Sequence, residues 1–300
     1  MRGSHPVPGA ETVRYGGNTS CVEVHVGDRL IILDAGTGII GLGNDLMKHH
    51  NATGSDPSDR APILFTILFS HTHHDHTQGF AFFKPAYVPT STCYLYGPRL
   101  LEEELEVGLS KAMLSPYFPV ELEDLSSVRN IRSLHESEII VFKEKECAPQ
   151  VLNYYRDNHS NQHYDLRIRL MRSYAHPNGG VFVYRIEANG KSLVYATDTE
   201  GYVGGDQRLI HFANECDLLI HDSQYMHPDY VLGSEMLVQG FGHSTVDMAA
   251  EVASKSKARR LALYHYDPQY SDATITEMEK RARSIYKNSI AAYEGLEIEL

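Results

Sequence analysis

The sequence predicts an α/β fold in which layered β-sheets carry helices on their outer faces. The first observation is the order of the elements: runs typical of strands and of helices alternate as strands, helix, strands, helix, and this order occurs twice. The second is Ile63–Phe69, a continuous apolar run of the kind found in strands buried on both faces. The third is the length of 300 residues, which one α/β domain can fill while burying a large core. We expect a single domain spanning residues 1–300.

The individual elements follow from short local patterns. Gly27-Asp28-Arg29 joins two β-rich runs and predicts a hairpin, and Asn189-Gly190 is the turn signal of a second hairpin. Apolar residues at helical spacing predict the helices. The expected strands are Cys21–Val26, Leu30–Leu33, Ile63–Phe69, Val181–Ile186, Leu193–Ala196, Leu218–Ile220 and Leu261–Tyr264, and the expected helices lie within Thr37–His50, Arg99–Leu114, Val246–Ser254 and Thr274–Lys287. The stretch from about 85 to 165 is the least regular, and we expect it to be an insertion carried by the same domain.

Composition narrows the class of protein. The hydrophobic fraction of 42% is typical of a globular protein, and no apolar run reaches the roughly 18–20 residues needed to span a bilayer. The first residues lack the apolar core of a secretory signal, so we expect a cytoplasmic protein with no membrane partner. The four cysteines form no CxxC pair, which excludes a thiolate zinc signature and indicates reduced thiols.

The charge of the chain bears on its partners. The formal net charge is -12, and an acidic surface repels long polyanions unless a local basic patch overrides it. No run is rich in Lys and Arg. The densest basic stretch, Arg167–Arg172, alternates charged with apolar residues and therefore predicts a strand with one solvated face. We expect nucleic acid to be an unlikely partner.

One segment carries most of the chemical information, because it places an HxHxDH pattern directly after the buried apolar run. The segment reads Phe69-Ser70-His71-Thr72-His73-His74-Asp75-His76. Imidazole nitrogens and a carboxylate oxygen suit Zn²⁺ and similar divalent ions. Alternate side chains of a short loop point in different directions, so His71 and His73 can serve one ion while Asp75 and His76 serve a second. The alternative is a surface polyhistidine cluster, which the preceding buried strand disfavours.

A dinuclear site needs further ligands, and three later residues are candidates. His176 stands just before an expected strand, whereas Asp198 and His265 each stand just after one. Sites of open α/β folds are commonly built where strands end. Taken singly, each of the three has an alternative interpretation as a polar residue at a strand edge.

Together these residues resemble the ordered ligand set of the metallo-β-lactamase superfamily. The pattern is similar to the branch that contains tRNase Z, the PhnP-type cyclic phosphodiesterases, and phage or bacterial cyclic-nucleotide phosphodiesterases. Tyr15–Cys21, Leu33–Gly38 and Gly242–Thr245 add to the resemblance, which runs from about residue 11 to about residue 270. The resemblance implies the four-layer αββα sandwich of that fold.

The resemblance also implies two divalent metal ions, Zn²⁺ in the first place and Mn²⁺ as the alternative. The implied ligands are His71, His73 and His176 for one ion, Asp75, His76 and His265 for the other, and Asp198 as the bridge between them.

The expected catalytic residues are Asp75, which is also a ligand, and His243. His243 resembles the residue with which the phosphodiesterase branch acts on the phosphate or the leaving oxygen. The alternative is that His243 caps the helix that starts near Thr245. Asp222 is expected to hold a neighbouring imidazole. Asp34, which matches a structural aspartate of the superfamily, is expected to fix the ligand loop by hydrogen bonds.

The favoured function is a phosphodiesterase that acts on a small or cyclic nucleotide-type phosphodiester. A tRNA 3′ processing endonuclease is the first alternative, but the chain lacks the Gly/Pro-rich arm and the basic patch expected for holding a tRNA. A lactonase or thioesterase is the second, and the His243 motif argues against it. A catalytically idle binding protein is the third, and the complete ligand set argues against it. We expect a homodimer, because relatives in this branch commonly pair. The polar loop around His159 and His163 could cover the site and stack on a base, or be a plain exposed loop.

Overall fold

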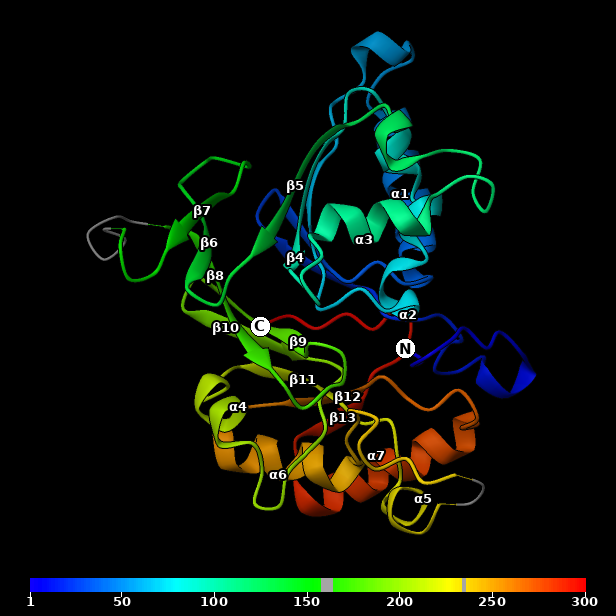
Figure 1. Ribbon diagram of the computed structural model, residues 1–300, viewed down its shortest axis with the longest axis vertical. Helices are drawn as coiled ribbons and strands as arrows, with labels where there is room; N and C mark the ends of the chain where they lie inside the picture. Colours follow the sequence, from blue (N-terminus) through cyan, green and yellow to red (C-terminus); the bar gives the residue numbers. More distant parts are fainter. Residues whose placement is uncertain (158–163, 234–235) are drawn as a thin grey trace. The chain divides into compact units, whose positions relative to one another are not determined.

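The computed structural model describes residues 1–157, 164–233 and 236–300 and places them in two compact units (Figure 1). The first unit consists of residues 19–135 and 145–149, and the second of residues 1–18, 136–144 and 150–300. Each unit is built on one β-sheet. The single domain of residues 1–300 stays a prediction, and the loop around His159 and His163 lies outside the described residues.

The first unit has a five-stranded sheet with the strand order β1-β2-β3-β4-β5. Strands β1 and β2 form the expected antiparallel hairpin, and the other neighbours are parallel. The strands are β1 (Val22–Val26), β2 (Arg29–Leu33), β3 (Leu64–Leu68), β4 (Thr92–Pro98) and β5 (Val128–Leu134), and the helices are α1 (Gly38–Ala52), α2 (His74–Thr77) and α3 (Leu105–Ala112). Burial of Ile67 and Phe69 on and after β3 fits the continuous apolar run. Truncating one such fully buried side chain to Ala costs about 2–5 kcal/mol.

The second unit has an eight-stranded sheet with the order β13-β12-β11-β10-β9-β8-β6-β7. Strands β10, β11, β12 and β13 are parallel, whereas β6 to β10 pair antiparallel. The strands are β6 (Glu138–Phe142), β7 (Gln150–Asn153), β8 (Leu166–Ser173), β9 (Val181–Ala188), β10 (Lys191–Ala196), β11 (Leu218–Asp222), β12 (Leu261–Tyr264) and β13 (Ser289–Ala291), and the helices are α4 (Gln207–Phe212), α5 (His227–Leu232), α6 (Val246–Ser256) and α7 (Asp272–Ile285). Figure 1 shows α6 and α7 side by side along this unit, where they cover a core built largely from β10 to β12.

Helix boundaries in the second unit have identifiable causes. The Thr245 hydroxyl accepts a hydrogen bond from the backbone N–H of Met248 at 3.2 Å and so caps α6. The Ser271 hydroxyl accepts from the backbone N–H of Thr274 and caps α7 in the same way. His243 is therefore not the cap of α6, which removes the structural alternative for that histidine.

The range from 85 to 165 differs from the expected irregular insertion. It contains β4, α3 and β5 of the first unit, and β6 and β7 of the second. Strand β4 lies between β3 and β5, so it is a central strand of its sheet. Its parallel partners are distant in sequence, and a pairing of this kind leaves no local turn signal. Sheets with helices packed on them in both units confirm the predicted α/β class.

Candidate metal centre

The ligand motif of the first unit begins where β3 ends, beside the end of β2. The two strands are parallel and Leu33 pairs with Leu68, so the residues that follow them emerge at the same edge of the sheet. Asp34 follows β2 with a φ of +61°, and Ser70 follows β3. A positive φ is rare for a residue with a side chain, and such outliers cluster at functional sites.

Asp34 orients two imidazoles of the motif. Its fully buried carboxylate accepts hydrogen bonds from the Ser70 backbone N–H at 2.6 Å and from the Ser70 hydroxyl at 2.8 Å. It also lies 2.7 Å from Nδ1 of His76, and that Nδ1 must be the donor because the carboxylate only accepts. Since the Ser70 hydroxyl donates to Asp34, it accepts from Nδ1 of His71 at 3.0 Å. Each imidazole thus carries its proton on Nδ1 and keeps the lone pair of Nε2 for a metal ion. The predicted role of Asp34 agrees with these contacts.

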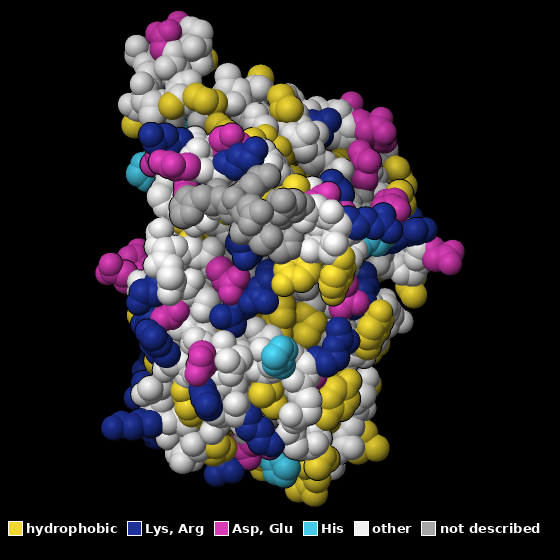
Figure 2. Space-filling model, turned by 90° about the vertical axis from the view of Figure 1, so that its left-hand side faces the viewer, with side chains coloured by type: hydrophobic (Ala, Val, Ile, Leu, Met, Phe, Trp, Pro, Cys, Tyr) yellow, Lys and Arg dark blue, Asp and Glu magenta, His cyan; other side chains and the backbone are white. Residues whose placement is uncertain are grey.

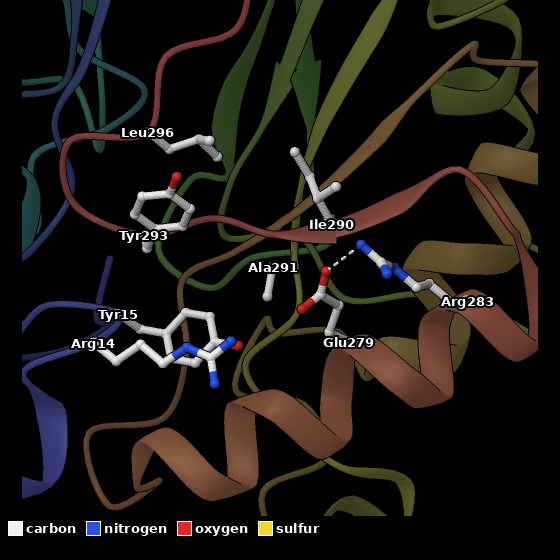
Figure 3. A pocket seen from close by; sticks show the side chains of 8 residues that line it. All are labelled: Arg14, Tyr15, Glu279, Arg283, Ile290, Ala291, Tyr293 and Leu296. Atoms are coloured by element: carbon white, nitrogen blue, oxygen red, sulfur yellow. Dashed lines mark ion pairs between the residues drawn. The ribbon is translucent and has the colours of Figure 1, made fainter.

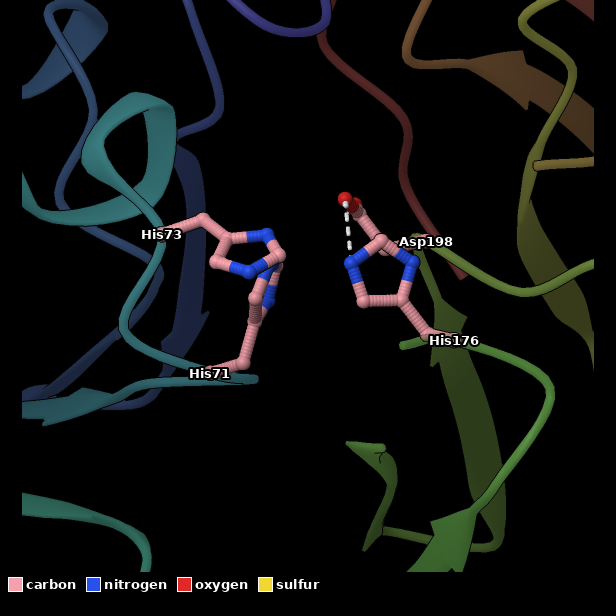
Figure 4. A group of neighbouring side chains, drawn as sticks. All are labelled: His71, His73, His176 and Asp198. Atoms are coloured by element: carbon pink, nitrogen blue, oxygen red, sulfur yellow. Dashed lines mark ion pairs between the residues drawn. The ribbon is translucent and has the colours of Figure 1, made fainter. Parts of the chain in front are cut away.

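The motif residues lie close together within the first unit. The rings of His71 and His73 have centroids 4.4 Å apart, and those of His71 and His76 are 4.3 Å apart. Nε2 of His76 lies 3.3 Å from Oδ2 of Asp75. The side chains of His71, Asp75 and His76 are buried. Figure 4 shows His71 and His73 extending from the loop that follows β3.

The second unit brings together the three later candidates. Asp198 follows β10 and His265 follows β12, and both have a positive φ, of +49° and +62°. Oδ1 of Asp198 lies 3.3 Å from Nε2 of His265, and Oδ2 lies 4.0 Å from Nε2 of His176, the pair joined by a dashed line in Figure 4. One carboxylate therefore faces two imidazole nitrogens, as a bridging ligand would.

The two histidines of the second unit are also held at Nδ1. Nδ1 of His176 donates to the Gly242 carbonyl at 3.1 Å, and Nδ1 of His265 donates to the side-chain oxygen of Gln224 at 3.0 Å. Burial lowers the pKa of His176, an effect that the neighbouring Asp198 carboxylate opposes. A neutral imidazole with its lone pair on Nε2 is the form that binds a metal ion. The imidazole and carboxylate donors of each unit, taken by itself, are of the kind that suits divalent ions such as zinc.

His243 is paired with Asp222, whose carboxylate also lies 3.9 Å from Nδ1 of His265. Nδ1 of His243 lies 2.7 Å from Oδ2 of Asp222, and Oδ1 of Asp222 accepts from the backbone N–H groups of Gln224 and Ser244. Asp222 is fully buried, so its carboxylate has a fixed position. The ring of His243 stacks on that of His265 with centroids 5.0 Å apart. The partner of Asp222 is thus His243, which agrees with the expectation that Asp222 holds a neighbouring imidazole.

Sequence reasoning missed several residues that support the ligands. Gln224 gives no signal of its own, although it stands two residues after Asp222. Two glycines lie directly against the imidazole rings of candidate ligands. A Cβ on Gly3 would lie 2.5 Å from Cε1 of His265, and a Cβ on Gly242, whose φ is +90°, would lie 2.2 Å from Nδ1 of His176. Neither position accepts a side chain without displacing the ring of a candidate ligand.

A cavity of about 360 Å³ lies in the second unit, and Figure 3 shows its lining. Its walls come from the segment Arg14–Tyr15, from α7, and from β13 with the residues that follow it. Glu279 and Arg283 form an ion pair across 2.6 Å at its edge. None of the lining residues is a candidate ligand, so the cavity is not the metal centre.

Two further expectations concern the rest of the chain. Within the described ranges, no helix is both long and apolar enough to cross a membrane. All four cysteines lie in the described ranges, and each is a free thiol there.

The comparisons with known proteins agree with this geometry. Residues 29–266 match the family model of the beta-lactamase superfamily domain. The ribonuclease Z of Sulfurisphaera tokodaii is 29% identical over 243 residues, which cover 75% of this chain and 77% of that protein. The solved structure of the short form of human tRNase Z has a TM-score of 0.58 at 18% identity and covers 100% of this chain and 96% of its own. A diphosphatase from the PhnP family has a TM-score of 0.60 at 16% identity, covering 94% of this chain and 84% of its own. These findings confirm the predicted metallo-β-lactamase fold and the resemblance to the branch with tRNase Z and PhnP.

The expectation that nucleic acid is an unlikely partner is wrong, because the relatives that match most of this chain include enzymes named ribonuclease Z. The expectation rested on net charge and on the lack of a basic run. Neither reports which charges folding brings together: strand pairing puts Arg169 of β8 opposite Arg185 of β9, and both guanidinium groups pair with Glu187. Figure 2 shows Lys and Arg side chains interspersed with Asp and Glu over the face in view. Local charge, not the total, decides whether a polyanion binds.

The enzyme class expected from the sequence is confirmed, since the family and its named relatives are hydrolases. The match over residues 29–266 covers most of the sequence, and the chain therefore belongs to the beta-lactamase superfamily as a metal-dependent hydrolase.

Proposed function

We propose that this hydrolase is a zinc-dependent phosphodiesterase, and that the Asp222–His243 pair supplies its general acid. The observation that carries the proposal is the 2.7 Å contact between Nδ1 of His243 and the buried Asp222 carboxylate. Hydrolysis of a phosphodiester expels an alkoxide, which needs a proton, whereas a thioester expels a thiolate that needs little help. A buried carboxylate behind an imidazole serves the first reaction better.

The pair defines which atom of His243 acts. Because Nδ1 donates to Asp222, Nε2 is the ring nitrogen directed away from the carboxylate, and it is the atom proposed to act on the substrate. In the protonated state the Asp222 charge stabilises the imidazolium, and Nε2–H can donate to a phosphoryl oxygen or to the leaving oxygen. The stacked ring of His265 and the nearby ring of His176 fix the plane of the imidazole.

The proposed metal-binding residues are the same set that the sequence predicts. They are His71, His73 and His176 for one ion, Asp75, His76 and His265 for the other, and Asp198 as the bridge. Two bound ions would lower the pKa of a water molecule to about 7 and would polarise the phosphoryl oxygens. Zinc is the first choice because tetrahedral sites of imidazole and carboxylate suit it, with manganese as the alternative. Asp75 keeps its proposed double role as a ligand and a catalytic residue.

The proposed substrate is a phosphodiester bond of RNA. The support is the similarity to enzymes named ribonuclease Z. The match to the ribonuclease Z of Sulfurisphaera tokodaii covers 77% of that protein. A small or cyclic nucleotide-type phosphodiester is the second candidate. Its support is the similarity to the solved diphosphatase from the PhnP family, which covers 94% of this chain.

The test is His243→Ala, measured on several phosphodiesters with zinc-loaded and manganese-loaded protein. We expect kcat to fall by roughly 10²–10⁴ while metal content stays unchanged, because His243 is not a proposed ligand. The loss should be large for a ribose alkoxide leaving group and small for p-nitrophenolate, which leaves without a proton.

The substrate panel separates the two candidates. It contains a precursor tRNA, cyclic mononucleotides, cyclic dinucleotides and bis-p-nitrophenyl phosphate. Cleavage of the RNA with a much higher kcat/KM than any cyclic nucleotide supports RNA as substrate, and the reverse order supports the small phosphodiester. An unchanged kcat in His243→Ala on every phosphodiester would contradict the phosphodiesterase proposal and favour a lactonase or thioesterase.

Two further expectations belong to this proposal. A cytoplasmic location is consistent with the reduced cysteines, since disulfides are rare in that compartment. A homodimer is proposed on the resemblance alone.

A further inference from the structure

Glu200 stands two residues after the candidate bridging ligand and binds a loop that contains two glycines. Its Oε1 accepts a hydrogen bond from the backbone N–H of Gly240 at 2.8 Å, and its Oε2 accepts from the backbone N–H of Gly242 at 3.0 Å. The Tyr230 hydroxyl donates to Oε1 as well. The backbone N–H of Glu200 itself donates to the carbonyl of Ala175 at 3.2 Å. One residue thus ties together three segments of the second unit.

The loop that Glu200 holds serves two functional histidines. The carbonyl of Gly242 accepts the Nδ1 proton of His176, and the next residue along the chain is His243. Gly240 and Gly242 have φ values of +86° and +90°. Glycine loses more backbone freedom on ordering than any other residue, so this loop needs an external contact to keep one conformation. The two bonds to the Glu200 carboxylate supply that contact immediately before the Gly242 carbonyl and His243.

We propose that Glu200 is a positioning residue that orients the ligand His176 and the acid His243 together, through the backbone of Gly240–Gly242. The inference rests on the proposed function for the role of His243, and on the donor geometry for the role of His176. The carboxylate of Glu200 binds the loop backbone and Tyr230, so its effect on the two histidines passes through the loop. Its removal should therefore weaken metal binding and slow the reaction at the same time.

The variants are chosen by the three hydrogen bonds that the Glu200 carboxylate accepts, from Gly240, Gly242 and Tyr230. Glu200→Ala removes all three. Glu200→Gln can turn its oxygen toward Gly242 and its amide group toward Tyr230, whose hydroxyl can accept, so it loses only the bond to Gly240. Tyr230→Phe is the matched control, because it removes only the bond from the Tyr230 hydroxyl to the same carboxylate and leaves both backbone bonds in place.

The experiment measures zinc affinity by competition with a chelator, kcat on a phosphodiester, and urea unfolding for each variant. We expect Glu200→Ala to lose about 10–100-fold in affinity for one of its zinc ions, as removal of a group that orients a ligand usually does. Its kcat should fall at least tenfold with KM nearly unchanged. Glu200→Gln should lose less on both measures, and Tyr230→Phe should match the parent protein.

The outcomes separate this proposal from simpler explanations. A variant Glu200→Ala that is less stable but keeps its zinc affinity and its kcat per folded molecule would show a purely structural role and overturn the proposal. If Glu200→Ala does not fold, the comparison of Glu200→Gln with Tyr230→Phe decides, and equal losses in the two overturn it. Glu200→Ala could lose zinc affinity while His243→Ala keeps its kcat. That result would support the role of Glu200 in orienting His176 and would reject only the phosphodiesterase proposal.

Discussion

Replacing Asp34 by Asn tests whether one carboxylate sets the tautomers of the metal-binding loop. The two side chains have the same shape, but Asn has one acceptor oxygen where Asp has two. In the native protein, Oδ1 of Asp34 accepts from the Ser70 backbone N–H, and Oδ2 accepts from both the Ser70 hydroxyl and Nδ1 of His76. Whichever way the Asn amide turns, its NH₂ group faces at least one buried donor.

The magnitude follows from these contacts. A buried donor left without an acceptor costs about 1–3 kcal/mol, so the free energy of unfolding should fall by about that amount. If the amide group faces Nδ1 of His76, the imidazole must carry its proton on Nε2 and can no longer bind a metal ion there. Zinc affinity should then fall by about 10–100-fold. Ser70→Ala removes the acceptor of His71 and one donor to Asp34 but keeps the bond from His76 to Asp34, so it should weaken mainly the ion that His71 binds.

The assay is a zinc titration against a chelator, with urea unfolding of the metal-free protein in parallel. Asp45→Asn is the control, because Asp45 lies exposed on α1 and pairs with Lys48 only through solvent-accessible groups. If Asp34→Asn bound both zinc ions as tightly as Asp45→Asn does, the network from Asp34 to the two imidazoles would not control their tautomers.

The remaining predictions concern the ions, the cap of α6 and the assembly. Elemental analysis of protein purified without chelators should give about two divalent ions per chain, and a value well under one would contradict the metal centre. Asp198→Ala should lower that content more than His73→Ala does, since a bridging ligand serves both ions; retention of both ions would remove the bridge. Thr245→Ala should lower the free energy of unfolding by about 1 kcal/mol without changing kcat, measured by urea unfolding, because it removes the N-cap of α6. Light scattering should give the mass of a dimer, and a monomer mass at all concentrations would reject that assembly.

The sequence was informative where the chemistry is local. The HxHxDH motif, Asp198 and His265 could be placed at strand ends because each follows a run of apolar residues. Asp34 and Asp222 could be assigned supporting roles only through the resemblance, and the structure places both on imidazole Nδ1 atoms. The hairpins were found from their turns.

The rest depends on contacts between distant residues. Strand β4 contains Gly97 and Pro98 and pairs with β3 and β5, so its assignment depends on partners that no local pattern reveals. Glu200 looks like an ordinary charged residue in the sequence, because its three partners lie 30 to 42 positions away. The charge argument against nucleic acid failed for the same reason, since a sum over the chain has no spatial information.

The two glycines that press on ligand rings, Gly3 and Gly242, bear on how such a protein can change during evolution. At both positions the nearest atom that a new Cβ would meet belongs to an imidazole ring, so a side chain can be accepted only by displacing that ring. We expect saturation mutagenesis to find almost no tolerated substitution at either glycine, although neither carries a functional group. An exposed position outside the Gly240–Gly242 loop, such as Tyr202, should instead accept many different side chains.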